Sequence, residues 1–112
     1  MKHSNELPAN RQISCNITAY TVVGGRRKKV QIINLNQTSL RIVAGEALAM
    51  SDQFAVDFTI SITGMLATIV FVANVTRRHK ISPGYYELDL EIYKIGEGVA
   101  RDLGDYLASY YR

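Results

Sequence analysis

Apolar and polar residues alternate with a period of two along most of the chain, which is the pattern of a strand with one buried face. In residues 53–62, for example, large apolar side chains alternate with small or polar ones. Residues 66–73 are largely apolar at both sets of alternating positions, which indicates a strand with the core on one side and a further covering element on the other. The pattern as a whole predicts six strands, at 13–23, 28–35, 40–43, 53–62, 66–76 and 86–92.

Turn signals separate these segments. The Gly-Gly pair at 24–25 supplies the positive φ angles of a tight hairpin, and glycine-containing turns follow the fourth and fifth strands at 63–64 and 82–84. Polar residues at 34–39 interrupt the second and third strands, and residues 45–52 are expected to form a longer loop. Short strands at regular spacing, each ending at a turn, are typical of an antiparallel barrel or sandwich.

A helix is predicted after Gly96. The apolar residues of this segment recur at helical spacing, at Val99, Leu103, Tyr106, Leu107 and Tyr110. Gly98 and Gly104 each weaken such a helix by about 1 kcal/mol relative to alanine, so we expect it to depend on packing. Its apolar face needs a partner, either the strand at 66–76 or a second copy of the chain. The expected fold is therefore mainly β, a six-stranded antiparallel β-barrel with a C-terminal α-helix.

Length and composition fit one such domain. The chain has 112 residues, of which 47% are hydrophobic, and we expect a short flexible lead at 1–10 followed by a single domain at 11–112. The lone Cys15 can form no internal disulfide, and no signal peptide is evident, so a cytoplasmic location is expected. The longest apolar run, at 65–73, is far shorter than the roughly 20 residues that a membrane span requires.

Positive charge is concentrated in two blocks. The formal net charge is only +3, but residues 26–29 and 77–80 hold seven of the thirteen lysines and arginines. If the strands run up and down consecutively, both blocks lie at one end of the barrel, and Arg11, residues 34–39 and the start of the helix lie at the other. One interpretation is that this basic end binds an acidic protein surface or nucleic acid. The alternative is a pair of solvated hairpin tips that limit aggregation. The partner-binding candidates at this end are Arg26, Arg27, Arg77 and Arg78.

Tyrosines gather near the C-terminus. Six of the seven lie between residues 85 and 111. Packing accounts for some of them, but Tyr110 and Tyr111 are adjacent on the terminal turn and cannot both face inward. An exposed aromatic end is a candidate docking surface or homodimer surface.

Known catalytic and metal-binding patterns are missing from the sequence. Glu87, Asp89 and Glu91 alternate along one strand face, which is the pattern of a solvated face rather than an acid/base pair. Neither His3 nor His79 has a second ligand at metal-binding spacing, and no phosphate loop or nucleophile elbow occurs. Cys15 is expected to be buried and inert. The sequence therefore predicts no enzymatic activity, no metal and no cofactor.

The order of these elements resembles the PilZ family, small bacterial β-barrels associated with the second messenger cyclic di-GMP. The resemblance covers about residues 7–110. It rests on Arg-Gln-Ile-Ser-Cys-Asn-Ile at 11–17, Ile-Asn-Leu-Asn-Gln-Thr-Ser-Leu-Arg-Ile at 33–42, Tyr-Glu-Leu-Asp-Leu-Glu-Ile at 86–92 and Ala-Arg-Asp-Leu-Gly-Asp-Tyr-Leu at 100–107.

The resemblance implies a nucleotide-binding corner with altered motifs. The family pattern Arg-x-x-x-Arg matches only at its second position, Arg11, because Leu7 stands at the first. In the pattern Asp/Asn-x-Ser-x-x-Gly, Asn34 matches the first position, while Asn36 replaces the serine and Ser39 the glycine. The implied ligand-binding residues are thus Arg11, Asn34, Asn36 and Ser39. The alternative for Asn34 and Asn36 is a plain β-turn that their side chains stabilise.

Two function classes remain open. The resemblance implies a bacterial signalling protein, a cyclic di-GMP receptor with weakened or lost nucleotide binding that acts as an adaptor through protein contacts. The alternative is a small basic barrel that binds nucleic acid through its two basic tips. The modest net charge and the shortage of aromatic residues within the basic blocks weigh against this second class.

Overall fold

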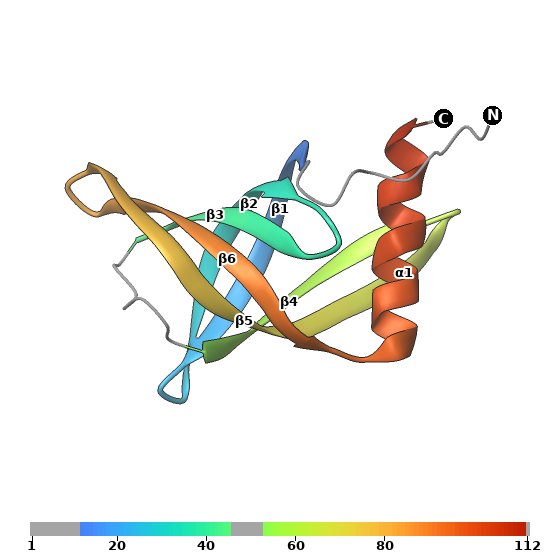
Figure 1. Ribbon diagram of the computed structural model, residues 1–112, viewed down its shortest axis with the longest axis horizontal. Coiled ribbons are helices and arrows are strands. Elements are labelled where there is room, and N and C mark those ends of the chain that lie inside the picture. Colours follow the sequence, from blue (N-terminus) through green and yellow to red (C-terminus); the bar gives the residue numbers. More distant parts are fainter. Residues whose placement is uncertain (1–11, 46–52, 112) are drawn as a thin grey trace.

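The computed structural model describes residues 12–45 and 53–111, and these form six strands, one α-helix and a short 3-10 helix (Figure 1). The elements are β1 (Ile13–Val23), β2 (Arg26–Leu35), β3 (Ser39–Ala44), β4 (Gln53–Ile62), β5 (Met65–Ser82), β6 (Tyr85–Ile95), α1 (Glu97–Ala108) and the 3-10 helix (Ser109–Tyr111). The expected strands and terminal helix are confirmed. The expected lead at 1–10, Arg11 and most of the loop at 45–52 lie outside the described residues.

The strands form a closed antiparallel ring in the order β1-β2-β3-β6-β5-β4. The expected barrel is confirmed, but its strands do not follow one another consecutively around the ring, because β1 pairs with β4 and β3 pairs with β6. The first four strands make a Greek key, in which the fourth returns to lie beside the first. The connection from β3 to β4 is much longer than a two-residue hairpin turn, so the chain can reach across to a strand that is not its neighbour in sequence.

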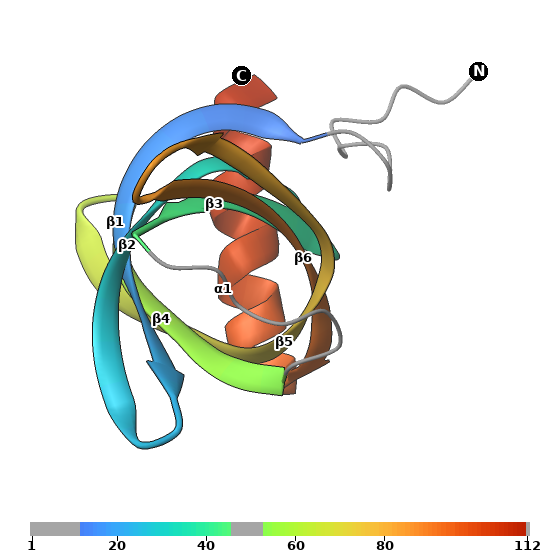
Figure 2. The same ribbon diagram turned by 90° about the vertical axis from the view of Figure 1, so that its left-hand side faces the viewer.

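Antiparallel pairing around the ring decides which loops share an end. Because β1, β3 and β5 run in one direction and the other strands in the opposite one, the β1–β2 and β5–β6 tips lie at the same end. The start of β1, the β2–β3 turn and the start of α1 lie at the other end. This division agrees with the expectation although the strand order differs. The two tips point in different directions and stay apart in both views (Figures 1 and 2).

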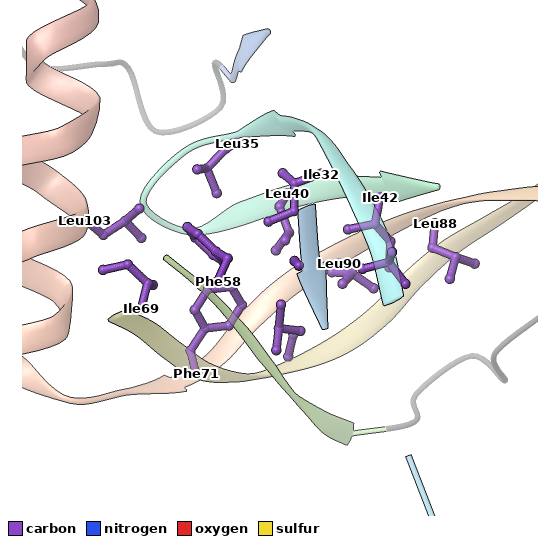
Figure 3. Packing of buried hydrophobic residues seen from close by; sticks show 14 of the residues in the cluster. Ile32, Leu35, Leu40, Ile42, Phe58, Ile69, Phe71, Leu88, Leu90 and Leu103 are labelled. Carbon is purple, nitrogen blue, oxygen red and sulfur yellow. The ribbon is translucent and has the colours of Figure 1, made fainter. Parts of the chain in front are cut away.

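A single cluster of apolar side chains fills the ring and extends to the helix (Figure 3). Phe58 and Phe71 meet edge to face, with ring centroids 6.1 Å apart. Leu103 reaches from α1 toward the end of the cluster, and it and Leu107 are at most 2% exposed. The helix therefore packs its apolar face onto the core at the barrel end, and not onto the outer face of β5.

Packing, rather than intrinsic propensity, holds α1 in place. Its N-cap residue, Gly96, makes no side-chain cap hydrogen bond. The glycine at 104 has a role, since a Cβ built there would lie 2.7 Å from Nε2 of Gln37. The β2–β3 turn therefore rests its Gln37 side chain directly on the helix backbone at Gly104.

The hairpin of β5 and β6 extends beyond the barrel. Pairing of β5 with β4 ends at Asn74, and pairing of β6 with β3 ends at Tyr86. The residues beyond, 76–85, are all exposed and pair only across the hairpin, so we call them the β5–β6 arm. The expected end of the fifth strand at residue 76 was wrong, since β5 continues through the second basic block to Ser82. Among the described residues, none of the helices has the length and apolarity to cross a bilayer.

Candidate functional site

The β2–β3 turn is organised by one buried side chain. Asn36 is 1% exposed, and its Oδ1 accepts hydrogen bonds from the backbone N–H groups of Thr38 and Ser39, both at 2.8 Å. The same oxygen lies 3.2 Å from Oγ1 of Thr38 and 3.2 Å from Oγ of Ser39. The turn is tied to β6 by the Ile92 N–H, which donates to the Thr38 carbonyl at 2.8 Å. This geometry favours the alternative in which Asn36 stabilises the turn.

Ser39 and Asn34 lie on either side of this turn. Ser39 begins β3, and its Oγ accepts a hydrogen bond from Nε2 of Gln12 at 3.0 Å. Asn34 is half-buried near the end of β2, between Ser14 of β1 and Arg41 of β3. Arg11 lies outside the described residues, but its successor Gln12 contacts the turn directly. The start of β1 and the β2–β3 turn are therefore neighbours.

A concave region lies on the outer face beside this turn, with a volume of about 280 Å³. We call it the turn-side hollow, and its lining residues are Gln12, Ser39, Leu40, Arg41, Thr76, Asp89, Leu90 and Glu91. Three strands of the ring supply it, because β6 lies between β3 and β5. Cross-strand register places Ser39 beside Glu91 and Arg41 beside Asp89.

Arg41 and Asp89 form a two-point ion pair within the hollow. Nε of Arg41 lies 2.7 Å from Oδ1 of Asp89, and Nη2 donates to Oδ2 at 3.4 Å. Glu87 adds a weaker contact at 3.9 Å from the same Nε. The hydrogen bond that Arg41 donates to Asp89 is the main reason that the pKa of Arg41 is raised above its ordinary value. The arginine is thus held in one orientation by a carboxylate on the neighbouring strand.

A second, smaller concavity adjoins the first and shares its central ion pair. This arm-side hollow has a volume of about 170 Å³ and is lined by Arg41, Arg77, His79, Glu87 and Asp89. Register places His79 opposite Glu87 and Arg77 opposite Asp89. Although a histidine and two carboxylates meet here, the described residues contain no group of side chains arranged to hold a metal ion.

The two hollows together combine hydrogen-bond donors and acceptors. The guanidinium of Arg41 and the polar groups of Gln12 and Ser39 suit phosphate or carbonyl oxygens. The carboxylates of Asp89 and Glu91 accept hydrogen bonds, as the N1–H and N2–H₂ edge of a guanine requires. The arrangement therefore suits a ligand that carries both anionic oxygens and donor groups.

The four arginines of the basic blocks do not converge on one surface. Arg27 donates to Asp57 of β4 at 2.9 Å and lies 3.8 Å above the Tyr20 ring, on the outer wall formed by β1 and β4. Arg77 lines the arm-side hollow, on a different part of the ring. Arg26 and Arg78 are exposed, near the β1–β2 tip and on the arm respectively. The shared basic end thus consists of two separate hairpins.

Tyr110 lies at the C-terminal end and is 47% exposed. Its ring meets that of Tyr106 edge to face at 5.4 Å, and the two hydroxyl oxygens are 2.9 Å apart. The pKa of Tyr106 is raised, mainly because the side chain is partly buried and secondly because of this hydrogen bond. The Tyr111 side chain is outside the part of the chain that the structure describes. Of the two candidate docking residues, Tyr110 is therefore shown to be exposed at the surface.

Cys15 is half-buried rather than fully buried. Burial raises the pKa of its thiol to about 11, and Sγ lies 3.7 Å from the Ile32 carbonyl oxygen. A thiol with such a pKa is almost entirely protonated at neutral pH, which agrees with the expected low reactivity.

Sequence reasoning identified Ser39 but missed most of the hollow. Arg41 could have been found, because it lies two residues after Ser39 and so shares its strand face. The carboxylates of β6 were seen as a solvated face, and nothing in the sequence showed that β6 lies beside β3. Nothing in the sequence around Gln12 or Thr76 indicated that these residues line the hollow.

Comparisons with known proteins identify the fold. No protein-family model and no curated protein matches the sequence. Among solved structures, the Bacillus subtilis inhibitor of motility (MotI/DgrA) matches with a TM-score of 0.79 and 12% identity, over 94% of this chain and 51% of that one. Borreliella burgdorferi PlzA, solved in complex with c-di-GMP, matches with a TM-score of 0.60 and 12% identity, over 91% of this chain and 52% of that one. This chain spans about half the length of each. The expected PilZ-like fold is confirmed.

Proposed function

We propose that this chain is a non-enzymatic signalling protein of the cytoplasm, a cyclic di-GMP receptor with weakened binding that acts as an adaptor through protein contacts. The observation that carries the proposal is the turn-side hollow, which lies beside the altered family motif in a PilZ-like fold. One structural neighbour was solved with c-di-GMP bound, which supports this ligand class.

The chemistry of the hollow explains why binding would be weak. Leu7 offers neither the planar donors nor the stacking face of the arginine that it replaces. The Asn36 oxygen already accepts the two backbone N–H groups of its own turn. Arg41 is paired with Asp89, so a phosphate must compete with a carboxylate for the same guanidinium. Each of these differences removes or occupies a group that would otherwise contact the nucleotide.

Titration calorimetry with cyclic di-GMP tests the receptor part. We expect saturable binding, lowered at least tenfold by Arg11→Ala and by Arg41→Ala, because a charge-assisted hydrogen bond contributes about 1.5–3 kcal/mol. Arg27→Ala is the matched control, since that arginine pairs with Asp57 on another part of the ring. Equal losses in all three variants would show that only general charge matters. Absence of binding heat at high ligand concentration would contradict the receptor part of the proposal and leave only the adaptor part.

The adaptor part rests on the basic end. The segments 20–30 and 76–86 that form the two hairpins contain no aspartate or glutamate, so this end is attractive to an acidic protein surface. Reversing Arg26, Arg27, Arg77 and Arg78 to glutamate should abolish capture of a protein partner in pull-downs. Unchanged capture would favour solvated tips. If the material captured by the wild type is nucleic acid and not protein, and the amount captured falls steeply as the salt concentration rises, the result would favour the nucleic-acid alternative.

A further inference from the structure

The arm-side hollow is built from two rows of side chains that cross neighbouring strands. In the first row, cross-strand register places Asp89 of β6 between Arg41 of β3 and Arg77 of β5. In the next row, Glu87 of β6 lies beside His79 of β5. All five side chains line the same concavity of about 170 Å³. The three strands that supply them lie side by side in the ring (Figure 1).

Two of the charges in this hollow satisfy each other. Arg41 holds Asp89 at two points, with nitrogen–oxygen distances of 2.7 and 3.4 Å. Within the described residues, Arg77 makes no ion pair, although Asp89 is its cross-strand neighbour. Among the same residues, the one ion pair of Glu87 is its 3.9 Å contact with Nε of Arg41. The groups left to bind a ligand are therefore a guanidinium and a carboxylate on neighbouring strands.

We propose that the arm-side hollow holds a guanine base of the nucleotide and that Arg77 and Glu87 select guanine over adenine, an inference that rests on the proposed function. The planar fork of an arginine matches the O6 and N7 acceptors of guanine, and a carboxylate accepts from its N1–H and N2–H₂ groups. Adenine has an amino donor in place of O6 and an acceptor at N1. It would set donor against donor and acceptor against acceptor, and such mismatches give specificity.

The other exposed carboxylate of this region does not offer the same combination. Glu91 lines the turn-side hollow, and its cross-strand neighbours are Ser39 and Asn74. Neither side chain has a guanidinium fork for O6 and N7. Among the residues that line the two hollows, an arginine without an ion pair lies near a carboxylate only in the arm-side hollow.

The two hollows would then take different parts of one ligand. Arg41 lines both of them, so a ligand that spans the two contacts it in the middle. The turn-side hollow has the polar groups that suit phosphate oxygens, and the arm-side hollow has those that suit the base. Neither Arg77 nor Glu87 belongs to the two family patterns, so base selection would lie outside them. Arg77 lies near the base of the β5–β6 arm, which leaves the rest of the hairpin to a protein partner.

Calorimetric titration with cyclic di-GMP and with cyclic di-AMP tests the inference. We expect the wild type to bind cyclic di-GMP at least about tenfold more tightly, since one bidentate contact to a base discriminates by about that factor. Arg77→Lys keeps the positive charge and loses the fork, so it should lose most of this preference. Glu87→Gln keeps the shape and replaces one acceptor with a donor. It should weaken binding of cyclic di-GMP and strengthen binding of cyclic di-AMP.

A third ligand and two control variants make the assignment specific. Cyclic di-IMP lacks the N2 amino group of guanine, so the wild type should bind it more weakly than cyclic di-GMP, and Glu87→Gln should reduce that difference. Arg101→Lys and Asp105→Asn are the matched controls, because both residues are exposed on α1. Both should keep the base preference of the wild type. Circular dichroism should show the same secondary structure in every variant.

The possible results separate this inference from the proposed function. Variants at Arg77 and Glu87 that remain as selective as the wild type would overturn the inference and leave the receptor proposal standing. Arg77→Lys that weakens both nucleotides equally would show a phosphate contact and overturn the role in base selection. A wild type without base preference would also overturn it. A wild type that binds neither nucleotide would overturn the receptor proposal and the inference together.

Discussion

Asn36 shows how a side chain at a ligand-motif position can stabilise the fold. It stands where the family pattern has serine, and the sequence could not reveal which groups would use its oxygen. In the structure the side chain is buried, and its oxygen holds the backbone of the turn. Arg41 shows the converse, because a residue outside both motifs is fixed by Asp89 at the centre of the hollow. Motif position reveals where a residue lies along the chain, but not what its side chain contacts.

Replacing Asn36 with alanine should destabilise the protein by about 1–3 kcal/mol, because the backbone N–H groups of Thr38 and Ser39 lose the buried oxygen that accepts their hydrogen bonds. Asn16→Ala, an exposed asparagine on β1, is the matched control and should change the free energy of unfolding by less than about 0.5 kcal/mol. Chemical denaturation measures both. Equal effects of the two substitutions would contradict the structural role of Asn36.

At the scale of elements, alternation and turn signals predicted most of the strands well. Their pairing partners were not predictable, because period-two alternation indicates a buried face without saying which strand lies beside it. The long connection at 45–52 allowed β4 to join β1, and this placed β6 beside β3. The hollow is a product of that pairing. The length of β5 was underestimated for a different reason, since an exposed hairpin arm has no core-facing pattern to reveal it.

The helix depends on its packing against the barrel end, so its stability is tested at its buried leucines. Leu103→Ala should lower the free energy of unfolding by about 2–5 kcal/mol, because it removes methyl groups from a residue that is 1% exposed. Met65→Ala, at a position 73% exposed in the β4–β5 turn region, should have little effect. Thermal unfolding of both variants makes the comparison. A small loss at Leu103 would mean that the helix is not part of the core.

At the scale of the whole molecule, different surfaces of one barrel carry separate proposed tasks. The turn-side hollow lies on the β3–β6–β5 face, and the two basic hairpins lie at the end opposite the helix start. The resemblance stated from the sequence predicted the fold correctly, because the order of strands along the chain can be followed in the sequence. It did not predict that Val22, Val70 and Leu66 are exposed, since the exposure of apolar residues depends on what the other elements leave uncovered.

The central claim is that the corner beside the β2–β3 turn is the site of cyclic di-GMP binding. Its most direct test is a titration of the ¹⁵N-labelled protein with cyclic di-GMP, followed by the backbone amide signals. We predict saturable shifts that cluster at Gln12, Ser39, Arg41 and Glu91 and leave Val22 and Val70 unchanged. A complete absence of saturable shifts, or shifts confined to the basic hairpins, would contradict it.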